Sequence, residues 1–124
     1  MRSADLRSFV HFSPSDVRRE TVFETDRLWA QMLCFERNQS LGPMSDPASD
    51  ALVQVVAGEG VVLVAGKRKR LQQWDAVLVP AGSDFVATNA SADPLVLFMV
   101  VAPPPPAGAD GGQGSLAERD GNGS

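Results

Sequence analysis

The stretch VLVPAGSDFVATN, residues 77–89, decides the fold because it is typical of two short strands joined by a tight turn. Pro80 presets the backbone angle of a turn, and Gly82 adopts conformations that strain other residues. Asn89 follows the second strand and can close its end by bonding its own backbone. The stretch therefore predicts a strand–turn–strand unit, and it raises the question of what Phe85 does in the second strand.

The rest of the central sequence is also rich in β-branched residues. Short runs separated by Gly, Pro and Asn predict strands over residues 28–36, 51–57, 61–65, 75–80, 84–88 and 94–102. A turn around Gly66 predicts that the charged run 67–70 begins a return strand. Residues 13–20 have the helical character of a single turn. A spacing of roughly ten residues per strand, without long helices, predicts a sandwich or barrel.

Composition limits the classes of function. A chain of 124 residues with 44% hydrophobic residues can build one core, and its net charge of −4 argues against nucleic acid as a partner. No apolar run is long enough to span a membrane, and the first residues lack a secretory signal. The single Cys34 fits a reducing compartment. We therefore expect a soluble, cytoplasmic protein without membrane or nucleic-acid partners.

The ends of the chain differ from the middle. Residues 1–19 are expected to form an N-terminal arm and residues 20–102 the barrel. Residues 103–124 are rich in Pro and Gly with little to bury, so we expect a disordered tail whose prolines stop the last strand.

Two spaced motifs resemble the paired motifs of the cupin superfamily. The second motif is a glycine, Pro-x-Gly, a histidine and an asparagine, and these places are taken by Trp74, Pro80, Gly82, Phe85 and Asn89. Residues 59–73 separate it from the first motif, a short spacing like that of small cupins.

The first motif is a glycine, two histidines, a glutamate and a closing glycine. Its places are taken by Asn38, Met44, Asp46, Ala51 and Gly58. The residues that shape turns are thus largely kept, whereas all four positions that hold metal in the family are changed.

The resemblance implies an all-β, double-stranded β-helix (jelly-roll) cupin barrel. In cupins a divalent metal is held by three imidazoles and one carboxylate, which Met44, Asp46, Ala51 and Phe85 cannot supply. We therefore expect no metal and no other cofactor, and a metal-dependent dioxygenase or isomerase is disfavoured. Similar small cupins form dimers through exchanged N-terminal strands, so residues 9–12 and 21–24 predict a homodimer.

The expected function is metal-independent binding of a small, mainly apolar organic ligand in the barrel. The predicted pocket residues are Met44, Asp46, Ala51, Phe85, Cys34 and Glu36. One alternative is a metal-free enzyme with Asp46, Glu36 or Cys34 as acid–base groups, although no catalytic residue is assigned. Another is a filled barrel that binds no ligand and serves as a dimeric interaction module. The sequence does not separate an open barrel from a filled one.

Overall fold

The structure is a computed structural model that describes residues 1–106 of the chain. Its elements are one 3-10 helix, η1 (Leu6–Phe9), and the strands β1 (Arg18–Glu24), β2 (Trp29–Phe35), β3 (Ser40–Met44), β4 (Asp50–Ala57), β5 (Glu59–Val64), β6 (Lys67–Gln72), β7 (Ala76–Val79), β8 (Phe85–Thr88) and β9 (Leu95–Ala102). β9 ends directly before the prolines. The disorder predicted for the tail concerns mostly residues 107–124, outside the described range.

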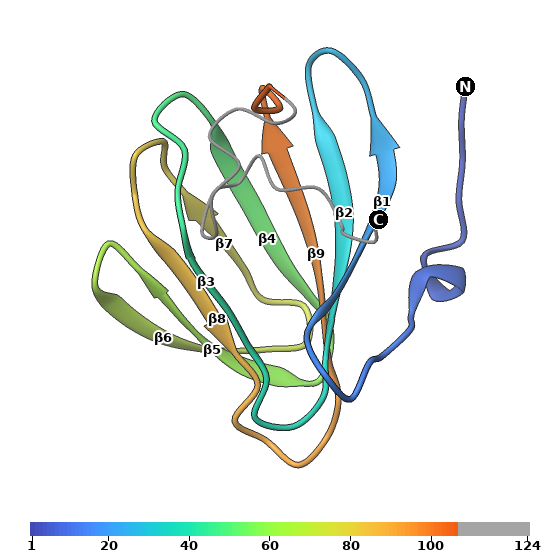
Figure 1. Cartoon of the computed structure of the whole chain (residues 1–124), viewed down its shortest axis with the longest axis vertical. Helices are drawn as coiled ribbons and strands as arrows, with labels where there is room; N and C mark the ends of the chain where they lie inside the picture. The colour runs from blue at the N-terminus through green and yellow to red at the C-terminus, as the bar shows by residue number, and fades with distance from the viewer. Residues whose placement is uncertain (107–124) are drawn as a thin grey trace.

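Within residues 1–106 the strands form two antiparallel sheets that face each other (Figure 1). One sheet has the order β1-β2-β9-β4-β7, and the other has the order β3-β8-β5-β6. The strands that are neighbours in a sheet are mostly distant in sequence, as expected of a jelly roll. The all-β fold predicted from the strand spacing is confirmed.

The main core lies between the two sheets. It combines inward-facing residues of both, including Val53 and Val55 of β4, Leu97 and Met99 of β9, and Ala87 of β8. β4 alternates exposed and buried positions at its start, which is the pattern of a strand with one face on a core. Each large apolar side chain buried here stabilises the fold by about 1.5–3 kcal/mol.

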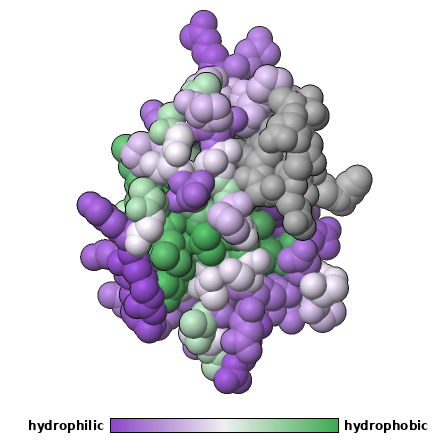
Figure 2. Space-filling model, turned by 60° about the vertical axis from the view of Figure 1, so that its left-hand side comes forward, coloured by the Kyte–Doolittle hydropathy of each residue, from purple (hydrophilic) through white to green (hydrophobic). Residues whose placement is uncertain are grey.

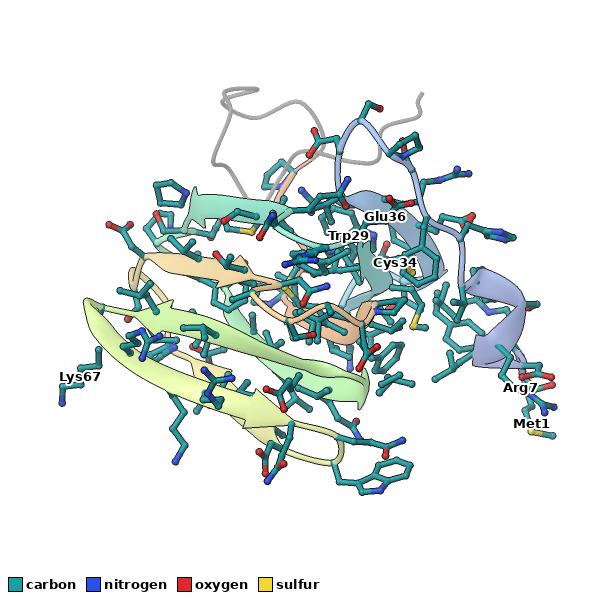
Figure 3. All side chains as sticks on the ribbon, turned by 90° about the horizontal axis from the view of Figure 1, so that it is seen from below. Met1, Arg7, Trp29, Cys34, Glu36 and Lys67 are labelled. Atoms are coloured by element: carbon teal, nitrogen blue, oxygen red, sulfur yellow. The ribbon has the colours of Figure 1, made fainter. Side chains whose placement is uncertain are left out.

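A second cluster lies on the other face of β2. Met32, Cys34 and Val96 pack there against apolar residues of the N-terminal arm, among them Phe9 and Phe12. In Figure 3 the labelled Cys34 lies toward that arm. Because the core covers one face of β2 and the arm covers the other, all seven residues of the strand are buried.

One local prediction was wrong, and one strand was not predicted. The helical turn expected over residues 13–20 is absent from the described chain, because β1 begins at Arg18 and pairs with β2. The short helix lies earlier instead, where Asp5 caps η1 by accepting from the Arg7 backbone N–H at 3.0 Å. β3 was not predicted, because Gly42 and Pro43 inside it are typical of turns rather than strands.

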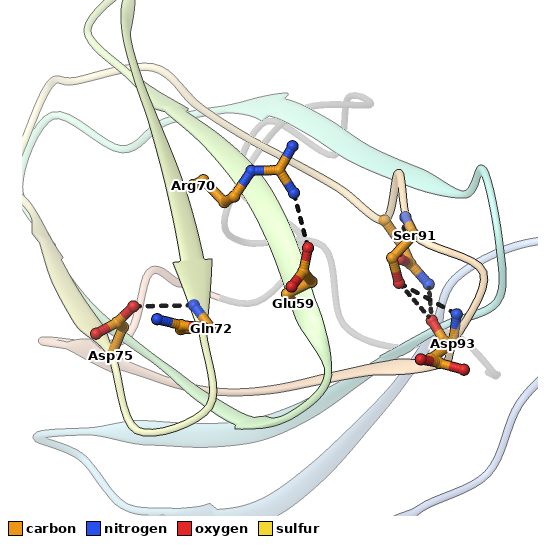
Figure 4. Close-up of polar contacts among 7 residues, drawn as sticks. Glu59, Arg70, Gln72, Asp75, Ser91 and Asp93 are labelled. Carbon is orange, nitrogen blue, oxygen red and sulfur yellow. Dashed lines mark hydrogen bonds and ion pairs between the residues drawn. The ribbon is translucent and has the colours of Figure 1, made fainter.

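The return strand predicted after Gly66 is confirmed as β6. Its charged residues are exposed, and Arg70 donates to Glu59 of the neighbouring β5 at 2.7 Å (Figure 4). The turn after β6 closes when Asp75 accepts from the Gln72 backbone N–H at 2.9 Å. Charged side chains on an edge strand of this kind disfavour pairing with another sheet.

Some apolar surface remains exposed. Leu52 of β4 and Leu78 of β7 are directly paired across the sheet and are 46% and 62% exposed. On the face that Figure 2 shows, hydrophobic side chains gather in one area framed by hydrophilic ones.

The segments proposed for strand exchange contact their own barrel in this chain. Phe9, Val10 and Phe12 cover the outer face of β2, and Thr21–Glu24 pair with β2. The homodimer therefore stays a prediction. No helix in residues 1–106 is long and apolar enough to cross a membrane.

Candidate functional site

The four glycine positions of the two motifs share a positive φ angle. Gly58 and Gly82 have φ values of 83°, and the two positions without glycine match them, with Asn38 at 68° and Trp74 at 79°. Asparagine tolerates this left-handed region, whereas an aromatic residue is strained there. The turns of the cupin pattern are therefore kept even where the glycine is not.

Trp74→Gly is expected to stabilise the protein by about 1 kcal/mol, because it relieves the left-handed strain at this position. Trp74 is 73% exposed, so its side chain has little packing to lose. Urea unfolding of the variant and the wild type measures the difference. A variant less stable than the wild type would show that the Trp74 indole contributes more to the free energy of unfolding than the strained backbone angle costs.

The two motif loops are tied together at one end of the barrel. The Gly82 backbone N–H donates to the Asp46 carbonyl at 2.8 Å, and the Ala81 N–H donates to the Asp50 carboxylate at 2.9 Å. The Asp46 carboxylate itself accepts from the Ala48 N–H at 2.8 Å, as in an Asx turn. These bonds fix the positions of Met44 and Phe85, which flank the two loops.

Three of the four changed positions meet inside this end of the barrel. Met44 and Phe85 are direct cross-strand partners between β3 and β8, and both are buried in the main core. Ala51 lies in the same core on the facing sheet, in a row formed by Trp29, Val101, Ala51 and Val79. Phe85 thus fills part of the core at the place where a cupin has a histidine.

These side chains do not fit the metal of the family. A thioether, a methyl group and a phenyl ring offer no ligand to a hard or borderline divalent cation. In the described part of the chain, no three His, Cys, Asp or Glu side chains lie close enough together to hold a metal ion.

The structure separates the other predicted pocket residues. Asp46 lies at the rim, half-buried, with its carboxylate turned to its own loop. Glu36 follows the last residue of β2, at the end of the barrel opposite Trp29 and Ala51. Cys34 belongs to the outer cluster under the arm. The structure therefore brings together Met44, Ala51 and Phe85 and places Asp46 beside them. It places Cys34 and Glu36 outside this group.

Cys34 is a buried thiol rather than a nucleophile. Its Sγ donates to the Phe9 carbonyl at 3.7 Å, and burial raises the pKa of the Cys34 thiol. Thiolate is the reactive form, so the folded protein keeps this group inert at neutral pH.

We expect Cys34 to react with iodoacetamide at pH 7 at least about tenfold more slowly in the native protein than in urea. Because its pKa is higher in the folded than in the unfolded state, its contribution to stability is complete below about pH 8.5 and declines as pH rises further. Comparing urea unfolding of the wild type and Cys34→Ala from pH 7 to pH 10 tests the sign. Equal alkylation rates in both states would show that the arm leaves the thiol open.

The polar side chain of Gln31 inside the barrel was not predicted from the sequence. Gln31 of β2 is 1% exposed and shares the inward face with Leu33 and Phe35. Its amide oxygen accepts from two nitrogens of Arg19, Nε at 3.1 Å and Nη2 at 3.0 Å. The sequence did contain a signal for this polar position, namely one glutamine within the otherwise apolar run WAQMLCF.

Trp29 lies beside this pair at the same barrel end. Its indole N–H donates to the Thr21 hydroxyl at 2.9 Å, and the Arg19 guanidinium carbon lies 5.8 Å from the centre of its ring. That distance is typical of a cation–π contact. Trp29 therefore takes part in holding Arg19.

The opposite end of the barrel is closed by Asn89. Its buried amide nitrogen donates to the Phe35 carbonyl at 3.3 Å and to the Asp93 carbonyl at 2.9 Å. Its amide oxygen accepts from the Ser91 backbone N–H at 3.0 Å. Asn89 therefore closes the end of β8, as the sequence predicted. Its hydrogen bonds, however, reach other segments of the chain as well as its own.

Solved structures share this architecture. The crystal structure of TT1209 from Thermus thermophilus matches with a TM-score of 0.82 and 28% identity over 85% of this chain and 100% of that chain. A protein with a double-stranded β-helix domain from Klebsiella pneumoniae matches with a TM-score of 0.78 and 22% identity over 83% and 90%. An RmlC-like cupin from Desulfovibrio desulfuricans matches with a TM-score of 0.77 and 20% identity over 85% and 99%.

Sequence comparison adds no relative, because no family model and no curated protein matches the chain. The two facing sheets and the structural matches define a double-stranded β-helix protein. Together with the paired motifs, these matches show that the chain has the fold of a small cupin domain, as its sequence predicted.

Proposed function

We propose that this cupin domain binds a small, mainly apolar organic ligand in its barrel without a metal ion. The observation that carries the proposal is the meeting of Met44, Ala51 and Phe85 at the barrel end where the family holds its metal. Apolar side chains at that place favour an apolar molecule and provide nothing to coordinate a cation.

Ala51 supports an open barrel rather than a filled one. It is the smallest side chain of its row, between Val101 and Val79, and it lies on the sheet opposite Met44 and Phe85. A methyl group at the place of a family glutamate has less volume than the side chain it replaces, and this favours an open interior.

The placement of the carboxylates and the thiol gives no support to a metal-free acid–base enzyme. Asp46 lies at the rim of the barrel, and Glu36 lies at the opposite end. Cys34 lies on the outer face of β2. General acid–base chemistry requires such groups within hydrogen-bond reach of one substrate. Binding is therefore the function that the geometry favours.

The test uses methionine methyl signals in a toluene titration followed by NMR. Met44 and Met99 belong to the barrel core, whereas Met32 belongs to the outer cluster. Toluene is expected to shift the methyl signals of Met44 and Met99 and to leave that of Met32 in place.

Ala51→Leu is the blocking variant, and Ala76→Leu, at an exposed position of β7, is the matched control. In an open barrel Ala51→Leu removes the toluene-induced shifts and costs less than about 1 kcal/mol of stability, whereas Ala76→Leu changes neither. A wild type whose core methionines do not respond to toluene, together with a loss of about 1–3 kcal/mol in Ala51→Leu, would establish a filled barrel and overturn the proposal.

A further inference from the structure

Gln31 is the polar side chain best placed to orient a ligand in the barrel. Its cross-strand partners are Thr21 on β1 and Met99 on β9. Met99 is paired in turn with Val53, so the row is apolar on the β9 side of Gln31. This row is directly adjacent to the row of Trp29 and Ala51. Gln31 therefore faces the same interior as the site described above.

The orientation of the Gln31 amide is fixed by Arg19. A guanidinium group has only donors, so the atom that receives two of its N–H groups must be the amide oxygen. The alternative assignment, with the amide reversed, would place donors against donors. The Gln31 Nε2 group consequently points away from Arg19.

This Nε2 group is buried and has no hydrogen-bond partner within residues 1–106. A buried donor left unpaired costs about 1–3 kcal/mol, and native proteins rarely leave one without a reason. The group next to it, Arg19, carries a positive charge, which favours an acceptor with a negative charge.

We propose that Gln31 Nε2 is the anchor for a carboxylate oxygen, so that the ligand is a small apolar carboxylic acid. The carboxylate accepts from Nε2, and the apolar body lies against Met99 and the cluster of Met44, Ala51 and Phe85. Arg19 is a positioning residue that holds the amide. This inference rests on the proposed binding function and adds the chemical class of the ligand.

The test compares benzoate with toluene, which has the same ring and no acceptor, by the methionine methyl titration. The wild type is expected to bind benzoate at least about tenfold more tightly than toluene, as one hydrogen bond to a charged group allows.

Gln31→Glu is the variant, because it keeps the shape and still accepts from Arg19 but offers no donor at neutral pH. It is expected to lose the preference for benzoate and to keep toluene binding. Circular dichroism checks that it remains folded. Gln31→Leu, which removes the donor without adding charge, is expected to give the same result.

The outcomes separate the two proposals. If toluene binds but benzoate binds no better, or if Gln31→Glu and Gln31→Leu keep the preference for benzoate, the anchor is wrong and the binding function stands. If neither probe shifts Met44 and Met99 in the wild type, both proposals fail. Loss of benzoate preference in both variants, with toluene binding intact, supports both.

Discussion

Replacing Met44, Asp46 and Phe85 by histidine and Ala51 by glutamate is expected to give a variant that holds stoichiometric zinc, whereas the wild type is expected to hold none. The four positions are those of the family's ligands, and Met44, Phe85 and Ala51 meet at one barrel end. Three imidazoles and one carboxylate are a ligand set that zinc accepts. Elemental analysis after dialysis measures the metal bound by the variant and by the wild type.

The variant Met44→His, Asp46→His, which keeps Ala51 and Phe85, is the control. Two imidazoles are fewer ligands than zinc sites in proteins use, so zinc is expected to dissociate from this variant during dialysis. Circular dichroism with and without zinc shows whether each variant folds. A folded four-fold variant that retains no more zinc than the control would mean that these side chains do not converge as described.

Gly58→Ala is expected to destabilise the protein by about 3 kcal/mol or more, whereas Gly66→Ala is expected to cost about 1 kcal/mol. Both glycines have left-handed angles, with φ values of 83° and 80°. A Cβ at Gly58 would lie 2.2 Å from the Pro94 carbonyl oxygen, whereas at Gly66 nothing among the described residues lies within 4 Å. The difference between the two variants therefore isolates the backbone clash.

Urea unfolding of both variants measures these changes in the free energy of unfolding. Equal losses would mean that Pro94 moves aside and that the closing turn of the first motif tolerates a side chain. A large loss at Gly58 alone would explain in physical terms why the motif ends on glycine, independently of any ligand.

The fold was predictable because its signals are local and repeated. The run rich in β-branched residues at 51–57 and the turn at Pro80 and Gly82 each predict structure without reference to distant residues. β3 was missed because Gly42 and Pro43 are poor strand residues, and only pairing with β8 makes that segment a strand.

The site was predictable only in part. The motif spacing brought Met44, Ala51 and Phe85 to one place, and the structure agrees. Cys34 was assigned to the pocket because strand alternation does not say which face looks inward when both faces are buried. Gln31 was missed because its importance depends on Arg19, which lies on another strand and is joined to it only by the folded sheet.

The central claim, a cupin barrel that binds an apolar molecule without metal, is tested most directly by native mass spectrometry of protein purified without chelator. The protein is measured as purified and again after incubation with zinc, manganese, iron and nickel. The account predicts a chain that stays metal-free in every case and carries the mass of a small organic molecule. Stoichiometric metal on the wild-type chain would contradict it, because it would require ligands that the barrel end described here does not supply.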